Sequence, residues 1–344
     1  MEYKIKLLNT ENNNNIIKFR FEENDKIKEL RLEYLDINIE DVPLSILNII
    51  FVLMIVPMCL YNEYTELYVN TLDKIFYDNF SLFINSFRSA DLCFNPQIKL
   101  IVDNKIIDIN KNSRKYDSIT LFSGGVDSYF TVLKYYKRES QLLLNIIGSD
   151  YSLSEYKKSY MPQLLHNTGS LLKLNIISCI SNFRSVLKER DWLYSDHAIR
   201  ILAHAIPLAW IYNSNHIYFS SGSKFIKPYS NNGSSYYQRP AAANNYIINR
   251  IEFNGTNILV NGSEYTRSEK IKYIVNKYEN EFKIGSPVFH VCWETRDGKN
   301  CCKCEKCCRT IYQILEDNLD PKKYGFPDYN LELLNKFKNL KYKL

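Results

Sequence analysis

The chain has 344 residues, 45% of them hydrophobic and 24% charged, and its formal net charge is +6. This composition excludes a disordered or fibrous chain, and the length is enough for a sizeable core and two domains. The positive charge is spread along the sequence, whereas nucleic-acid-binding proteins usually concentrate it in a patch. We therefore do not expect a nucleic acid as partner.

The most apolar segment, 43–60, is predicted to be a buried helix. Its uninterrupted core, 49–56, is shorter than the roughly 20 residues that a bilayer-spanning helix needs, and Asn48 and Pro57 flank it. The N-terminus also lacks the long apolar region of a signal peptide. We expect a cytoplasmic protein without a membrane partner. The nine cysteines are then expected to be metal ligands or free thiols.

Residues 1–115 are predicted to form a separate α+β accessory domain. Four elements are expected in it: a strand, the buried helix, a further helical stretch and a hairpin with its turn at Asp103-Asn104. They cover, in this order, residues 16–21, 43–61, 67–87 and 97–109. Because no cluster of catalytic residue types occurs here, we expect a role in packing or recognition. A polar linker, 111–114, follows.

Residues 116–320 are predicted to form an α/β domain, a parallel sheet with helices on both faces, followed by a tail, 321–344. Strand and helix patterns alternate along this region. Strands are expected at 118–122, 141–148, 173–177 and 216–220, and helices at 128–136, 154–168 and 197–212. Ligands bind such sheets at the carboxyl ends of the strands. Polar residues follow three of these ends, so three strand ends are expected to meet at one crevice.

The hexapeptide Ser123–Ser128, SGGVDS, lies between the first of these strands and its helix. Two glycines allow backbone N–H groups to approach an anion, and a helix N-terminus adds unpaired N–H groups and a positive dipole end. Ser123 and Ser128 offer hydroxyl donors, whereas Asp127 would orient the loop or bind Mg²⁺. No Walker A string, G-x-x-x-x-G-K-[ST], occurs in the chain. The alternative is a surface turn in which these residues only cap the helix.

A cysteine motif follows with the spacing C-x8-C-x2-C-x2-C, formed by Cys292, Cys301, Cys304 and Cys307. Four thiolates at such spacing are typical of a closed, structural Zn²⁺ site. Three alternatives remain open. Cys302 or Cys308 could replace one ligand, His290 could enter the metal shell, or a C-x2-C could be a redox pair.

The two motifs together, in this order, resemble 7-cyano-7-deazaguanine synthase, a family of the PP-loop (N-type) ATP pyrophosphatases, over residues 116–315. The resemblance implies an adenine-nucleotide α-hydrolase-like fold and an ATP-dependent C–N ligase. Such an enzyme adenylates the carboxylate of 7-carboxy-7-deazaguanine, releasing pyrophosphate and AMP, and uses ammonia to form an amide and then a nitrile. ATP, Mg²⁺ and a structural Zn²⁺ are the implied cofactors.

The resemblance also implies roles for single residues. Arg267 and Lys270 are expected to neutralise the adenylate phosphate or the leaving pyrophosphate, with helix-surface charge as the alternative. Catalytic roles are further expected for Ser123, Asp127 and Ser128. The expected nucleotide-binding set consists of Phe122, Ser123, Gly124, Gly125, Val126, Asp127, Ser128, Asp150, Tyr151, His197, Arg200, Ser221 and Gly222.

The chain also departs from that family. About 115 residues precede the loop, and the family's Pro-Gly-Arg-Asn signature is absent around 196–200. The chain is thus similar to a wider group of synthase-like proteins, some linked to phage defence and acting on macromolecules. The expected acceptor is a deazapurine carboxylate or a protein, and a homodimer is expected only from the resemblance. A tRNA-thiolating PP-loop enzyme and a non-catalytic ATP-binding subunit are the alternatives.

Overall fold

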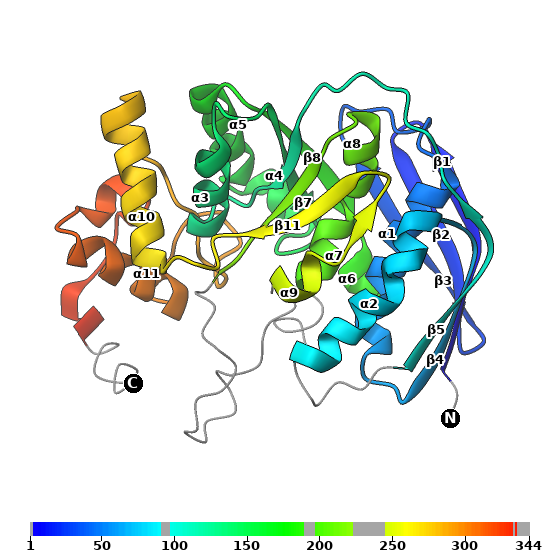
Figure 1. Cartoon of the computed structure of the whole chain (residues 1–344). Coiled ribbons are helices and arrows are strands. Elements are labelled where there is room, and N and C mark those ends of the chain that lie inside the picture. Colours follow the sequence, from blue (N-terminus) through cyan, green and yellow to red (C-terminus); the bar gives the residue numbers. More distant parts are fainter. Residues whose placement is uncertain (1–2, 91–96, 189–196, 223–244, 333, 336–344) are drawn as a thin grey trace.

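The computed structural model describes residues 3–90, 97–188, 197–222, 245–332 and 334–335. Its strands form one 11-stranded sheet in the order β10-β11-β9-β6-β7-β8-β3-β2-β1-β4-β5 (Figure 1). The strands are β1 Tyr3–Asn13, β2 Ile16–Glu23, β3 Lys26–Tyr34, β4 Tyr64–Asp73, β5 Gln97–Ile106, β6 Ser118–Leu121, β7 Gln141–Ile147, β8 Asn175–Ser181, β9 His216–Ser220, β10 Glu252–Phe253 and β11 Thr256–Asn261.

Helices cover both faces of the half of this sheet that contains β6 to β9. The α-helices are α1 Leu44–Cys59, α2 Lys74–Ala90, α3 Val126–Tyr135, α4 Leu153–Lys158, α5 Met161–Leu172, α6 Phe183–Val186, α7 His197–Ala203, α8 Ile206–Ile211, α9 Asn245–Ile248, α10 Arg267–Val275 and α11 Glu305–Glu316. A π-helix, η2 Asn276–Phe282, continues α10, and a short 3₁₀ helix, η3 Pro321–Tyr324, follows α11.

The strands β8, β7, β6, β9 and β11 run parallel to one another. The parallel sheet that the sequence predicts is thus confirmed in this half of the molecule. Along the chain, β7 and β8 are added on one side of β6, whereas β9 and β11 are added on the other. The order therefore reverses between β6 and β9. Such a switch point opens a crevice at the carboxyl ends of its strands, which is where ligands bind in open α/β sheets.

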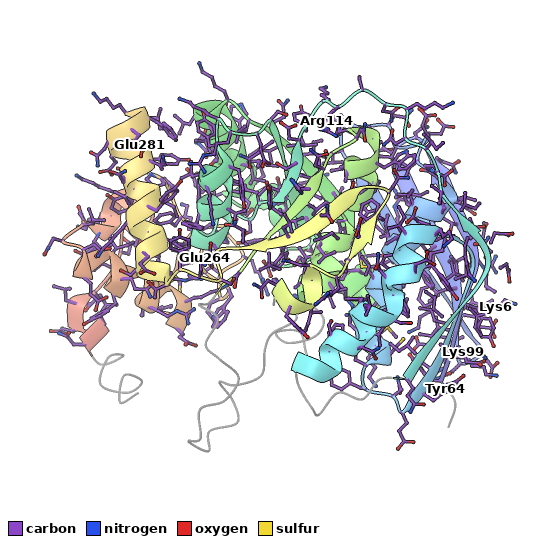
Figure 2. The ribbon with its side chains drawn as sticks, in the orientation of Figure 1. Lys6, Tyr64, Lys99, Arg114, Glu264 and Glu281 are labelled. Atoms are coloured by element: carbon purple, nitrogen blue, oxygen red, sulfur yellow. The ribbon has the colours of Figure 1, made fainter. Side chains whose placement is uncertain are left out.

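The N-terminal strands extend the same sheet and make it mixed. β3 pairs antiparallel with β8, β2 pairs antiparallel with β1 and β3, and β1, β4 and β5 are parallel. Residues before and after position 115 therefore share one sheet. An autonomous domain over 1–115 stays a prediction. Figure 2 shows Lys6, Tyr64 and Lys99 on the side of β1, β4 and β5 that faces away from α1 and α2.

Helix α1 confirms the buried helix expected at 43–61, since all but one of its residues are buried. It packs against β1 and β4 of the N-terminal strands and against α7 and α8 of the other half. One hydrophobic cluster consequently joins both halves on this face, while a second, formed with α3, α5, α10 and α11, lies on the other. Among the described residues, no helix combines the length and apolar character required to cross a bilayer.

Two expected elements near the N-terminus are wrong. The helix expected at 67–87 begins only at Lys74, because its first seven residues belong to β4. The strand ends at Asp73, whose carboxylate accepts a hydrogen bond from Phe76 N at 2.9 Å in the first turn of α2. The hairpin expected at 97–109 is the single strand β5. Its supposed turn stays extended, with Asn104 paired with Thr71, since turn-type side chains can point to solvent from an edge strand.

Two expected helices are each interrupted. The helix expected at 154–168 is divided into α4 and α5 at Ser159-Tyr160, where Pro162 favours a new helix start. The helix expected at 197–212 is divided into α7 and α8 just before Pro207, whose missing N–H cannot continue the first helix. In both cases the proline opens the second helix.

Candidate nucleotide and metal site

The loop Ser123–Ser128 follows β6 directly and opens α3 at the switch point of the sheet. Gly124 has φ +75°, and a Cβ there would lie 2.9 Å from Leu164 Cδ2, so only glycine fits without strain. Gly125 is the N-cap and supplies no side-chain acceptor to the first N–H groups of α3. Because these groups also lack acceptors within the helix, the loop offers them to an anion.

The remaining loop residues divide into packing and polar groups. Phe122 and Val126 are buried in the hydrophobic cluster beneath the loop, so their side chains hold it rather than contact a ligand. The Ser128 hydroxyl donates to Gly125 O at 2.9 Å and accepts from Ser123 N at 3.4 Å. Ser128 therefore ties the two ends of the turn together, while the Ser123 side chain is exposed.

Asp127 joins this loop to α10 through two ion pairs. Its Oδ2 lies 2.6 Å from Arg267 Nη2, and its Oδ1 lies 2.9 Å from Lys270 Nζ. Lys270 is 1% exposed and also donates to Ser221 O at 2.6 Å. The structure thus brings together the aspartate and the two cations that the sequence had placed about 140 residues apart.

The start of helix α10 places Arg267 and Lys270 beside Asp127. Thr266 and Glu269 form a capping box, in which Thr266 Oγ1 accepts from Glu269 N and the Glu269 carboxylate accepts from Thr266 N. The helix therefore begins at Arg267, whose side chain is 10% exposed. Its Nη1 is buried and has no hydrogen-bond partner among the described residues. An unpaired guanidinium N–H beside a helix N-terminus suits an anionic oxygen.

The charges around Asp127 bear on its expected role as a magnesium ligand. Burial alone would raise the pKa of Asp127, but the nearby charges of Arg267 and Lys270 outweigh it and lower the pKa below its ordinary value. Asp127 is therefore ionised at neutral pH, with both oxygens already accepting from cations. Because each oxygen already accepts from a cation, Asp127 orients Arg267 and Lys270, and its role as a magnesium ligand stays a prediction.

The residues at the end of β9 also lie beside Asp127. Ser221 N donates to Asn261 O at 2.8 Å, which holds the end of β9 to that of β11. A Cβ on Gly222 would lie 3.9 Å from Asp127 Oδ2. Ser221 and Gly222 thus lie beside the ion-pair cluster, as expected. The residues that follow, 223–244, lie outside the described residues.

The end of β7 carries a third group of the expected site residues. Tyr151 is 8% exposed, and its hydroxyl is 2.8 Å from His290 Nε2. Burial holds the pKa of His290 at about 4, so its ring is neutral near pH 7. Asp150 is exposed, and its charge opposes the lowering of the pKa of His197, which burial nevertheless brings to about 4. Tyr151 and His290 are thus in contact, whereas His197 is linked to this group only through the charge of Asp150.

Arg200 is placed elsewhere, and its expected role in nucleotide binding is not supported. Its side chain is fully buried, with Nε donating to Met54 O of α1 and Nη2 donating to Lys188 O, both at 3.1 Å. A guanidinium that satisfies backbone carbonyls in the core stabilises the contact between α1 and α7.

The four expected cysteines converge at the start of α11. The Sγ atoms of Cys292, Cys301, Cys304 and Cys307 all lie within 4.8 Å of one another. Two of the separations, Cys292 to Cys304 and Cys301 to Cys307, are 3.9 Å. Sulfurs bound tetrahedrally at about 2.3 Å from Zn²⁺ would be about 3.8 Å apart. The cluster could therefore hold a zinc ion.

Cys302, Cys308 and His290, the other residues considered as ligands, do not belong to this cluster of four. Cys302 Sγ is directed to Asn300 O and Cys308 Sγ to Cys302 O, while His290 Nε2 contacts Tyr151. Within the four, burial and the neighbouring Cys292 thiolate raise the pKa of Cys307, whereas hydrogen bonds lower the pKa of Cys292 to about 6 despite burial. All four thiols can be ionised together only beside a cation.

The cysteine segment packs against the loop, which sequence analysis did not foresee. His290 N donates to Gly124 O at 2.8 Å, and the Arg296 guanidinium donates to Asp150 O. Lys306 stands between two of the cysteines and was expected only as a positive charge beside the metal. Burial and the charge of Arg267 lower its pKa, whereas Asp150 and Asp127 oppose this. Its only signal in the sequence is its place in the motif.

Comparison with known proteins finds no matching family model, no matching curated protein and no matching solved structure. The function must therefore be inferred from the geometry described above.

Proposed function

We propose that this protein is an ATP-dependent ligase that adenylates a carboxylate, releases pyrophosphate and passes the acyl group to a nitrogen nucleophile. One observation carries the proposal. A glycine loop at a helix N-terminus, at the switch point of a parallel sheet, faces two buried cations, one of which has an unpaired buried N–H. This combination supports binding of a polyphosphate.

In this proposal the chain acts by positioning and by charge. The loop N–H groups and the Ser123 hydroxyl bind the phosphate oxygens, and Arg267 and Lys270 stabilise the negative charge that grows on the α-phosphate and the leaving pyrophosphate. Asp127 holds the two cations in place beside the phosphates, and its role as a magnesium ligand stays a prediction. No covalent protein nucleophile is required. If a metal is bound at the four cysteines, it has a structural role there, since four protein ligands leave no open position.

The proposed acceptor is 7-carboxy-7-deazaguanine or a related carboxylate, with ammonia as nucleophile, or a carboxylate on a protein. These assignments rest on the resemblance to 7-cyano-7-deazaguanine synthase and on nothing in the geometry. A tRNA-thiolating enzyme would need a reactive cysteine pair. The gathering of four sulfurs in one cluster argues against such a pair within the motif.

The test is AMP and pyrophosphate formation from Mg-ATP by the purified chain, with 7-carboxy-7-deazaguanine and ammonium present. We expect Lys270→Met to abolish AMP formation, because it removes a cation from the reacting phosphates. Lys272→Met is the matched control, since Lys272 lies on the same helix and is exposed. Equal AMP formation by Lys270→Met and wild type would refute the proposal, and ATP binding without AMP release would favour a non-catalytic subunit.

A further inference from the structure

The two edges of the sheet differ in length. At one end β10 has two residues, whereas at the other end β5 has ten. β5 pairs with β4 in one register along its whole length, and no other described strand lies on its second side (Figure 1). It contains no proline, and no shift of register marks a bulge. Natural edge strands are usually short, bulged or interrupted by proline, because a long regular edge pairs with another strand.

Apolar side chains lie on both faces of β5. On the face covered by α1 and α2, Ile98, Leu100 and Val102 pack against the hydrophobic cluster that joins the two halves. Lys99 lies on the open face (Figure 2), and strand alternation places the half-buried Ile101 on the same face. Pairing of this edge with another strand is favourable, because it removes apolar surface on both faces from water.

The sequence of β5 indicates which strand fits beside it. Two copies of one strand pair about a two-fold axis when they run antiparallel. Side chains of the open face must then oppose side chains of the open face, so the axis passes through a residue and not between two residues. Each residue of β5 therefore defines one possible register. Unlike charges opposite each other stabilise a pair of strands, and like charges destabilise it.

An axis at Ile101 brings unlike charges together on both sides of it. Lys99 of each copy then lies opposite Asp103 of the other, and the two Ile101 side chains meet on the axis. An axis at Lys99 or at Asp103 would instead place two like charges against each other. An axis at Leu100 or at Val102 would oppose Ile101 to a charged residue. Among these central positions, Ile101 is therefore the favoured axis.

An axis further along the strand is less favourable. At Asn104 it would oppose Asp103 to Lys105, but Lys105 Nζ lies 4.1 Å from the centroid of the Tyr77 ring, on the side of α2. That axis would also pair only residues 102–106 of β5, whereas the axis at Ile101 pairs residues 97–105. The longer pairing satisfies more of the backbone groups at the edge.

We propose that β5 is the interface of a homodimer, in which two copies of this chain pair antiparallel about a two-fold axis at Ile101. The sheet then continues from one copy into the other. Assembly stops at the dimer, because the pairing uses the β5 edge of both copies. β5 lies among the residues before the loop Ser123–Ser128, which the synthase family lacks. The surface is therefore not implied by that resemblance, and it is independent of the proposed function.

Sedimentation velocity on the full chain tests the interface. We expect wild type to be mainly dimeric at about 50 µM. Asp103→Lys and Lys99→Asp should each raise the dissociation constant by about tenfold or more, because each replaces two unlike pairs across the axis by two like pairs. An equimolar mixture of the two variants should recover the dimer, since every pair across the axis is then unlike. The matched control is Glu29→Lys, a charge reversal of an exposed acid on β3.

The mixture also separates the interface from folding. Lys99→Asp loses the ion pair of Lys99 Nζ with Glu66 Oε1, 3.2 Å apart within one copy. A chain that failed to fold for this reason would not regain the dimer when it is mixed with Asp103→Lys. Recovery in the mixture therefore requires two folded chains that recognise each other through these two positions.

Single cysteines test the register. Ile101→Cys should form a disulfide-linked dimer under mild oxidation, because opposed Cα atoms in antiparallel strands are about 4.5–5.5 Å apart. Lys99→Cys should not, since its two copies would lie about 13 Å apart along the strands. Wild type, oxidised in parallel, accounts for the native cysteines.

Three results would overturn the inference. One is a wild type that stays monomeric at about 100 µM, which would leave the edge to a different protein. Another is a dimer whose dissociation constant is the same in wild type, Asp103→Lys and Glu29→Lys. The third is cross-linking through Lys99→Cys and not through Ile101→Cys, which would contradict the register.

Discussion

Replacing Asp127 by Asn keeps the size of the side chain but removes the charge that Arg267 and Lys270 share. In the folded protein Lys270 is 1% exposed, and the side chains of Arg267 and Asp127 are 10% and 17% exposed. The variant therefore leaves two cations close together in a place with little access to water. Ser221 O remains as an acceptor for Lys270, but it carries no full charge.

The expected loss of stability in this variant follows from the burial of the two cations. Removing one partner of a buried ion pair costs about 3–5 kcal/mol, because the remaining charge is desolvated without compensation. The amide oxygen of Asn still accepts one hydrogen bond, so we expect the free energy of unfolding to fall by about 3 kcal/mol at pH 7. The pKa of Asp127 is lowered in the folded state, so its contribution is present above its ordinary pKa of 3.8 and is lost as the pH falls through the folded value. The difference between wild type and variant should therefore shrink below about pH 4.

Urea unfolding of wild type, Asp127→Asn, Lys270→Met and the double variant measures this directly. The double variant should be more stable than the sum of the single effects implies, with a coupling above about 1 kcal/mol. The matched pair is Lys272 of α10 and Asp317 at the end of α11, an ion pair whose lysine is 62% exposed; its coupling should stay below about 1 kcal/mol. A loss of less than about 1 kcal/mol in Asp127→Asn would refute the reasoning.

Three further predictions concern other parts of the molecule. We expect mass spectrometry to find one zinc ion in wild type, Cys301→Ser to release it, and Cys302→Ser and Cys308→Ser to retain it; release by all three would contradict the ligand set. Gly124→Ala should lower the free energy of unfolding by about 1–3 kcal/mol more than Gly255→Ala. Both glycines have positive φ, but a Cβ at Gly255 would meet no atom within 4 Å. Equal losses would show that the contact with Leu164 does not contribute. Burial lowers the pKa of His204 to about 4, as it does for His197 and His290, so stability should fall as the pH drops from about 6.5 to about 4. His204→Asn should reduce this slope by about one third, and an unchanged slope would exclude His204 as one of its sources.

The loop and the cysteine cluster could be predicted because their signals are local. A strand, two glycines and a helix start stand within a dozen residues, and the spacing of the four cysteines is itself the ligand pattern. Arg200 could not be placed in this way. Apolar neighbours surround it in the sequence, but nothing there indicates that α1, some 150 residues earlier, covers this face of α7 and offers Met54 O to the guanidinium.

Geometry also argues that the cysteine cluster and the loop Ser123–Ser128 are a single unit. Cys292 lies between His290, whose backbone N–H binds Gly124 O, and Arg296, whose guanidinium binds Asp150 O. The ends of β6 and β7 are therefore both attached to the segment that the cluster anchors. Because four neighbouring thiols cannot all ionise without a cation, loss of the metal would release Cys292 and, with it, the segment that supports the loop. A structural metal at this position would thus control the shape of the crevice without taking part in its chemistry.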